Sequence, residues 1–108
     1  MIKFFRKFRQ KKIIKKINKQ LFEKGEYAIL IGSDEDNHIF ADAIMGISED
    51  PTQVMYDSEK VIEAFMKENK WSYEDAEEWY EFNTVRSVEY LQDENKPKLI
   101  NTYDGYIM

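Results

Sequence analysis

The chain has no cysteine, two prolines, four glycines and one histidine among its 108 residues. The absence of cysteine excludes a disulfide framework, thiolate catalysis and a cysteine-based zinc site. The four glycines are scattered, so the sequence contains neither a P-loop nor a GxGxxG dinucleotide motif. A chain without cysteine fits a reducing compartment, and we expect a cytoplasmic protein.

Long apolar runs are also missing. No run approaches the roughly 20 apolar residues that a membrane span requires. At the N-terminus, Phe and Ile alternate with Lys and Arg, unlike the uninterrupted apolar segment of a secretory signal. Apolar residues nevertheless make up 43% of the chain and aromatic residues 15%, which suffices for the core of one small domain.

Acidic residues are nearly absent from residues 1–24, which contain ten cations and one acid, a net charge of about +9. Residues 25–108 contain six cations and twenty acids, about −14. This division predicts a basic helical arm at 1–24 and an acidic domain at 25–108. The candidate binding residues of the arm are Lys7, Arg9, Lys11, Lys12, Lys15, Lys16 and Lys19.

The arm is expected to be helical over residues 2–23, with Gly25 as its C-terminal stop. Its apolar residues form two groups on nearly opposite sides, Phe4, Phe5 and Phe8 in one, and Ile13, Ile14, Ile17 and Leu21 in the other. This pattern leaves two alternatives. Either the helix bends near residues 9–12, or residues 1–9 fray and only 10–23 packs.

Alternating apolar residues and turn signals predict four strands, at 27–31, 38–47, 52–56 and 98–103. The first two form a hairpin around a polar turn at 33–37, which would leave His38 at a strand edge. Two further helices are expected, one capped by Asp57 or Ser58 and ending near Asn69, the other beginning at Ser72 and ending near Asn83. The predicted fold is α+β, a mostly antiparallel four-stranded sheet covered by two helices, with a basic N-terminal helix.

Three short motifs follow one another in the middle of the chain. They are Val54, Tyr56, Asp57 and Lys60, then Ser72, Glu74, Asp75, Ala76 and Glu78, then Phe82 and Asn83. With the hairpin before them, they make residues 27–100 resemble a group of small uncharacterised bacteriophage proteins. The resemblance implies phage origin and a host bacterial cytoplasm. It supplies no activity, cofactor or site residue.

The helix expected at 72–83 is the strongest candidate interaction surface. Its acids project within about 160° of one another at 100° per residue, and they are Glu74, Asp75, Glu77, Glu78 and Glu81. Ala76, Trp79 and Tyr80 face the other way, while Phe82 lies at the edge. Such a ridge can imitate a row of phosphates and occupy a basic groove, or it can simply be the solvated face of a surface helix. Trp71 and Phe82 are the aromatic residues expected to add short-range contact.

The basic arm has three interpretations. It can bind nucleic acid through its lysines, lie on an anionic membrane with its phenylalanines buried, or pack its aliphatic stripe on the acidic domain of its own chain or of a second copy in a homodimer. Nucleic-acid binding by the whole protein is disfavoured, because the acidic domain would repel the same phosphates.

Catalytic and metal-binding patterns are weak. Asp34, Asp36 and His38 alternate and could meet a divalent ion, but a polar hairpin turn explains them more simply. No nucleophile elbow accompanies His38, and Arg86, the only arginine of the acidic domain, is expected to anchor a carboxylate. We therefore expect a non-enzymatic binding protein without metal or cofactor. It would be an inhibitor that blocks a host or defence protein through its acidic surface. The alternative is an accessory protein that associates with membrane or nucleic acid through the arm.

Overall fold

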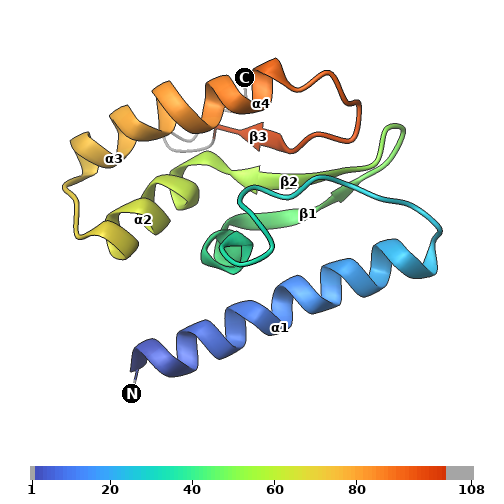
Figure 1. Ribbon diagram of the computed structural model, residues 1–108, viewed down its shortest axis with the longest axis horizontal. Coiled ribbons are helices and arrows are strands. Elements are labelled where there is room, and N and C mark those ends of the chain that lie inside the picture. Colours follow the sequence, from blue (N-terminus) through green and yellow to red (C-terminus); the bar gives the residue numbers. More distant parts are fainter. Residues whose placement is uncertain (1, 102–108) are drawn as a thin grey trace.

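The computed structural model describes residues 2–101, with side chains from residue 5 onward, and shows an α+β fold (Figure 1). Its elements in chain order are α1 (Ile2–Glu23), the 3₁₀ helix η1 (Asn37–Ala43), β1 (Ile44–Ser48), β2 (Gln53–Asp57), α2 (Ser58–Asn69), α3 (Tyr73–Trp79), the π-helical turn η2 (Tyr80–Val85), α4 (Arg86–Tyr90) and β3 (Lys98–Ile100). The sheet lies between α1 and the continuous helix formed by α3, η2 and α4.

The sheet over these residues has three strands in the order β1-β2-β3 and is mixed. β1 and β2 form an antiparallel hairpin in which Ile47 pairs with Val54, whereas β3 pairs parallel to β2, with Tyr56 opposite Leu99. The predicted four-stranded, mostly antiparallel sheet is therefore wrong. The strands expected at 52–56 and 98–103 correspond to β2 and β3, except that residues 102 and 103 lie outside the described part.

The hairpin predicted for residues 27–47 is also wrong, because residues 27–31 are irregular and 37–43 form η1. Of the second predicted strand, 38–47, only residues 44–47 are extended, and they belong to β1. The backbone N–H groups of this irregular segment, 27–31, form hydrogen bonds, but not to a neighbouring strand. Ile29 N–H donates to the Asn95 carbonyl (2.9 Å), and Ile31 N–H donates to the Tyr56 hydroxyl (3.1 Å). η1 packs against both α1 and α2. A helix covered on several sides carries apolar residues all round, and this pattern is easily taken for a buried strand.

Local signals placed the start of α2 and the end of α1 correctly. The Asp57 carboxylate accepts a hydrogen bond from Glu59 N–H (3.0 Å), which caps α2. At the end of α1, Gly25 has φ +66°, and Glu26 N–H reaches the Leu21 carbonyl (2.9 Å), the pattern of a glycine C-cap. Between Ile2 and Glu23 the helix is continuous.

The aliphatic side of α1 packs on the rest of the chain, as one of the three interpretations of the arm expected. Ile14 and Leu21 are buried, and Ile17 packs against the core. Asp42 at the end of η1 accepts hydrogen bonds from Arg9 and from Gln10 (3.1 Å). The bond from Arg9 holds the pKa of Asp42 below its usual value, although partial burial opposes this shift. α1 is thus attached through both an apolar stripe and an ion pair.

Tyr56 lies at the centre of the core with Val54 and Val61, all three fully buried. Burial raises the pKa of Tyr56 to about 12, and the bond from Ile31 opposes the shift. Because the folded-state pKa is raised, this group stabilises the fold fully below pH 10, and that contribution is lost as pH rises from about 10 to about 12.

For Tyr56→Phe we expect a free energy of unfolding about 1–3 kcal/mol lower at pH 8, because Ile31 N–H loses its acceptor. We also expect a shallower decline between pH 10 and 12, since the ionising hydroxyl is gone. Urea unfolding at pH 8 and pH 11 measures both effects. Tyr90→Phe, which removes an exposed hydroxyl, serves as the control. An alkaline decline equal to that of the native chain would contradict this account.

Candidate functional site

The side chains of α3 are held in place from its first residue. The Ser72 hydroxyl oxygen accepts a hydrogen bond from Asp75 N–H (3.2 Å) and so caps the helix, as its sequence predicted. Ala76 and Tyr80 point into the core, and the Tyr80 hydroxyl lies 2.6 Å from the Ser58 hydroxyl of α2. With these two positions buried, the opposite face of α3 must be exposed.

That exposed face, continued into η2, carries four of the five predicted acids, Glu74, Asp75, Glu78 and Glu81. None of the five forms an ion pair with a cation among the residues described. Their charge is therefore not neutralised from within the described chain and is available to a partner.

Glu77, the fifth acid, is half-buried instead and lies near the hydroxyl of Tyr73 (3.5 Å). The same hydroxyl donates to Glu59 (2.9 Å). Desolvation, and then the bond and charge of Glu59 with a smaller contribution from Glu77, raise the pKa of Tyr73 far above its usual value. Tyr73 is thus a protonated donor that links α3 to α2, and Glu77 belongs to this contact rather than to the exposed face.

Aromatic side chains adjoin these acids. The Trp79 side chain is 47% exposed and that of Phe82 57%. Trp71 is half-buried, packs on the core and lies 5.5 Å from Trp79 between ring centroids. The prediction that Trp79 faces away from the acids with Ala76 and Tyr80 is wrong, because Trp79 is exposed and lines a depression together with Asp75 and Glu78.

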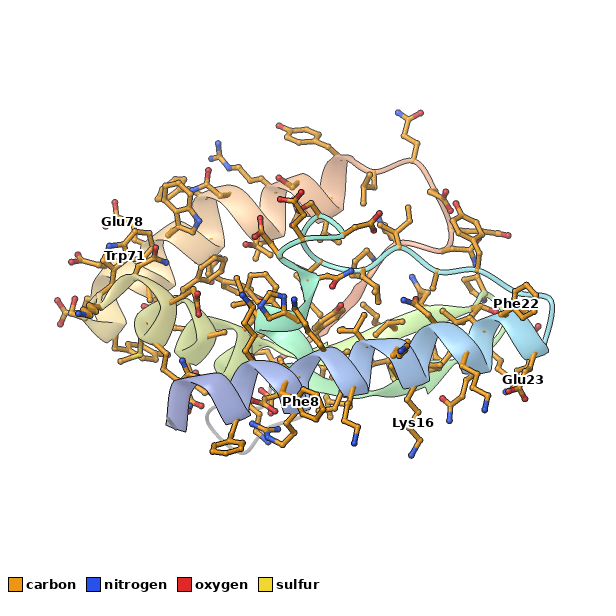
Figure 2. All side chains as sticks on the ribbon, turned by 60° about the horizontal axis from the view of Figure 1, so that its bottom comes forward. Phe8, Lys16, Phe22, Glu23, Trp71 and Glu78 are labelled. Carbon is orange, nitrogen blue, oxygen red and sulfur yellow. The ribbon has the colours of Figure 1, made fainter. Side chains whose placement is uncertain are left out.

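Together these rings form a shallow depression of about 440 Å³ with carboxylates at its rim. Its lining residues are Trp71, Asp75, Glu78, Trp79, Phe82 and Asn83. Figure 2 shows Trp71 and Glu78 at one end of the molecule, away from Lys16 and Phe22 of α1. Exposed rings beside unpaired carboxylates suit a lysine or arginine side chain, which can contact a ring face and a carboxylate together. We call this region, with Glu74 and Glu81, the acidic-aromatic face.

The π-helical turn η2 decides what the helix presents after Tyr80. Inward-facing positions occur at Ala76, Tyr80 and Val85, so the last interval is five residues instead of four. A π turn adds this residue and shifts the phase of everything after it. A constant helical period predicted that this helix ends near Asn83. The five-residue interval between the inward-facing positions Tyr80 and Val85 was the signal in the sequence that could have revealed the π turn.

Arg86 follows the π turn and contacts an aromatic ring rather than a carboxylate. Its guanidinium carbon lies 5.1 Å from the centroid of Phe82, and no ion pair in the described residues includes it. The predicted carboxylate anchor is therefore wrong. The contact holds the exposed Phe82 ring against the helix.

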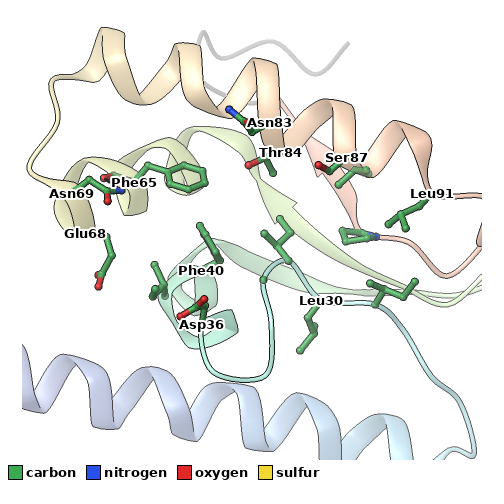
Figure 3. Close-up of a pocket in the computed structure, with 16 residues that line it drawn as sticks. Leu30, Asp36, Phe40, Phe65, Glu68, Asn69, Asn83, Thr84, Ser87 and Leu91 are labelled. Atoms are coloured by element: carbon green, nitrogen blue, oxygen red, sulfur yellow. Dashed lines mark hydrogen bonds between the residues drawn. The ribbon is translucent and has the colours of Figure 1, made fainter.

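A second concavity, which the sequence did not predict, lies on the other side of the π turn. This cavity of about 700 Å³ has mostly apolar walls, including Phe40, Phe65 and Leu91 (Figure 3). Asn83, Thr84 and Ser87 supply neutral polar groups from the helix, and Asp36 and Glu68 supply carboxylates. No imidazole lines the cavity, so the hydroxyls there have no general base of the serine-hydrolase kind.

The polar turn and His38 differ from their predicted roles. His38 is a buried residue of η1, not a strand-edge residue. Within residues 2–101, no three His, Asp or Glu side chains gather closely enough to hold a metal ion, so the divalent-ion alternative for Asp34, Asp36 and His38 is not supported.

The predicted arm residues are all exposed, namely Lys7, Arg9, Lys11, Lys12, Lys15, Lys16 and Lys19. Phe5 and Phe8 are exposed as well, while the side chain of Phe4 lies outside the described part. No helix in residues 2–101 combines the length and apolar character that crossing a bilayer requires.

No family model, curated protein or solved structure matches this chain. Its function must therefore be inferred from its own surfaces.

Proposed function

We propose that the protein is a non-enzymatic binding protein that docks on a basic surface of another protein through the acidic-aromatic face. The observation that carries the proposal is the exposure of Trp79 and Phe82 beside Asp75 and Glu78, acids without an ion-pair partner in the described residues. Aromatic anchors surrounded by charge are typical of the residues that dominate binding energy and steer association.

The acids attract the partner and the rings hold it. A lysine or arginine of the partner would enter the depression, contact Trp79 and approach the carboxylates at the rim. The exposed acids of α3 and η2 would then imitate a row of phosphates in a basic groove of the partner. Combined with the resemblance to phage proteins, this supports an inhibitor that blocks a host or defence protein by stoichiometric binding.

The test uses a labelled nine-residue arginine peptide as a stand-in for a basic surface. For Glu74→Gln/Glu78→Gln/Glu81→Gln we expect about tenfold weaker binding at 0.15 M salt and a weaker salt dependence, because three attractive charges are removed. Fluorescence anisotropy across a salt series measures both quantities.

The matched control is Glu35→Gln/Glu63→Gln/Glu94→Gln, which removes three other exposed acids and leaves the net charge equal to that of the test variant. Equal loss of affinity in both variants would show attraction to overall charge alone. Peptide binding by the native chain that is insensitive to salt would also refute the proposal.

A further inference from the structure

The cations of α1, together with Lys24 directly after it, differ in whether they pair with the acidic domain. Arg9 and Lys24 point to the domain and pair with Asp42 and Glu49, the second at 3.0 Å. Five exposed lysines of α1 pair with no acid of the domain among the described residues, namely Lys11, Lys12, Lys15, Lys16 and Lys19. Among these lysines and within the described residues, Lys19 alone has an ion-pair partner, Glu23 of the same helix, at 3.9 Å. Attachment of α1 to the domain therefore leaves its outer charge uncompensated.

Phenylalanines share this outer side. Phe8 is 57% exposed and Phe22 84%, and at 100° per residue both project within about 60° of Lys19. Figure 2 shows Phe8 and Lys16 on the side of α1 turned away from the rest of the chain, and Phe22 at the C-terminal end of α1. The Lys12 ammonium lies 5.3 Å from the centroid of the Phe8 ring. We call this side, with the lysines above, the outer face of α1.

We propose that the outer face of α1 binds the surface of an anionic lipid bilayer, with α1 lying parallel to the membrane. The 22 residues of α1 give it a length of about 33 Å. Phenyl rings can enter the boundary between headgroups and acyl chains while ammonium groups meet lipid phosphates. Duplex nucleic acid would use the lysines and leave the rings in water, so the combination favours lipid.

The acidic-aromatic face does not oppose this attachment. α1 and α3 lie on opposite sides of the sheet (Figure 1). Charges are screened over about 8 Å at physiological salt, so the acids of α3 add little repulsion at the membrane. Attachment through α1 would instead point the acidic-aromatic face toward the aqueous phase.

The test measures partition of the full chain onto vesicles of phosphatidylcholine with 30% phosphatidylserine and onto pure phosphatidylcholine vesicles. We expect binding to the anionic vesicles only. Each lysine near the surface contributes about fivefold to the partition coefficient, so Lys15→Gln/Lys19→Gln should reduce it about 25-fold. Phe8→Ser/Phe22→Ser should reduce it about tenfold, because ring burial is lost.

Phe22→Trp adds a direct readout of ring insertion. Its emission should shift to the blue on anionic vesicles, whereas native Trp71 and Trp79, at the other end of the molecule, should not shift. The matched control Glu74→Gln/Glu78→Gln should bind vesicles as the native chain does. Circular dichroism checks that each variant keeps its helix content.

Several results would overturn the proposal. They are equal binding to both vesicle types, no binding to either, or binding that survives Phe8→Ser/Phe22→Ser without a blue shift in Phe22→Trp. Retention of a 20-base-pair DNA at 0.15 M salt without vesicle binding would assign the face to nucleic acid. Self-association lost in Lys15→Gln/Lys19→Gln, again without vesicle binding, would assign it to a second copy of the chain.

Discussion

Tyr80→Ala is expected to lower the free energy of unfolding by about 3–5 kcal/mol, the usual cost of truncating a buried aromatic residue. Tyr80 is 4% exposed, lies where α3 meets η2, and shares a hydroxyl contact with Ser58. Truncation leaves a cavity under the helix and removes the partner of Ser58. Because the free energy of unfolding of a small domain is only about 5–15 kcal/mol in total, this single change should remove a large part of it. Urea unfolding followed by circular dichroism measures it.

Two variants separate packing from hydrogen bonding at this position. Tyr80→Phe keeps the ring and should cost about 1 kcal/mol, since only the contact with Ser58 is lost. Trp79→Ala, at the neighbouring and half-exposed position, should cost about 1 kcal/mol or less. If Tyr80→Ala costs no more than Trp79→Ala, the helix is not anchored through Tyr80.

Trp79→Ala should instead weaken binding of the arginine peptide about 30-fold, the factor that corresponds to a hot-spot contribution of about 2 kcal/mol. Its ring is exposed in the acidic-aromatic face and lies 5.5 Å from Trp71, so it offers a pre-positioned surface to a guanidinium. Removing it leaves the carboxylates but takes away the short-range contact. The peptide should therefore still be attracted at low salt and bind weakly at 0.15 M.

The matched control for this experiment is Tyr90→Ala. Tyr90 is an exposed aromatic residue of the same continuous helix but does not line the depression. It should bind the peptide like the native chain. Equal loss in both variants would mean that exposed aromatic area, rather than this depression, retains the peptide, and the proposed site would be withdrawn.

Predictions from the sequence succeeded where a local signal was sufficient. The start of α2 at the Asp57 cap and the end of α1 at Gly25 were both correct, because capping depends on a few adjacent residues. The exposure of Glu74, Asp75, Glu78 and Glu81 followed from helical periodicity. The prediction for Trp79 failed because a helical wheel gives only the direction in which a side chain projects. Its exposure also depends on how far the neighbouring elements extend.

Prediction failed where a segment's conformation depends on distant partners. Residues 37–43 have the composition of a buried strand, yet they form a 3₁₀ helix packed against both α1 and α2. The parallel pairing of β3 with β2 joins the end of the described chain to its middle, and no turn signal encodes such a pairing. The 700 Å³ cavity likewise needs five separate segments of the chain and a π turn.

The sequence alone determined the division of charge, the caps at the start of α2 and α3 and at the end of α1, and the amphipathic character of α2 and α3. These properties depend on residue type and on the spacing of nearby residues, so they can be predicted without knowing the rest of the fold. Tertiary structure decided which cations remain free for a partner, because Arg9 and Lys24 are paired by acids 33 and 25 residues away. It also decided which rings are exposed beside the acids, since the packing of Tyr80 and the π turn set the rotation of the helix that carries Trp79 and Phe82.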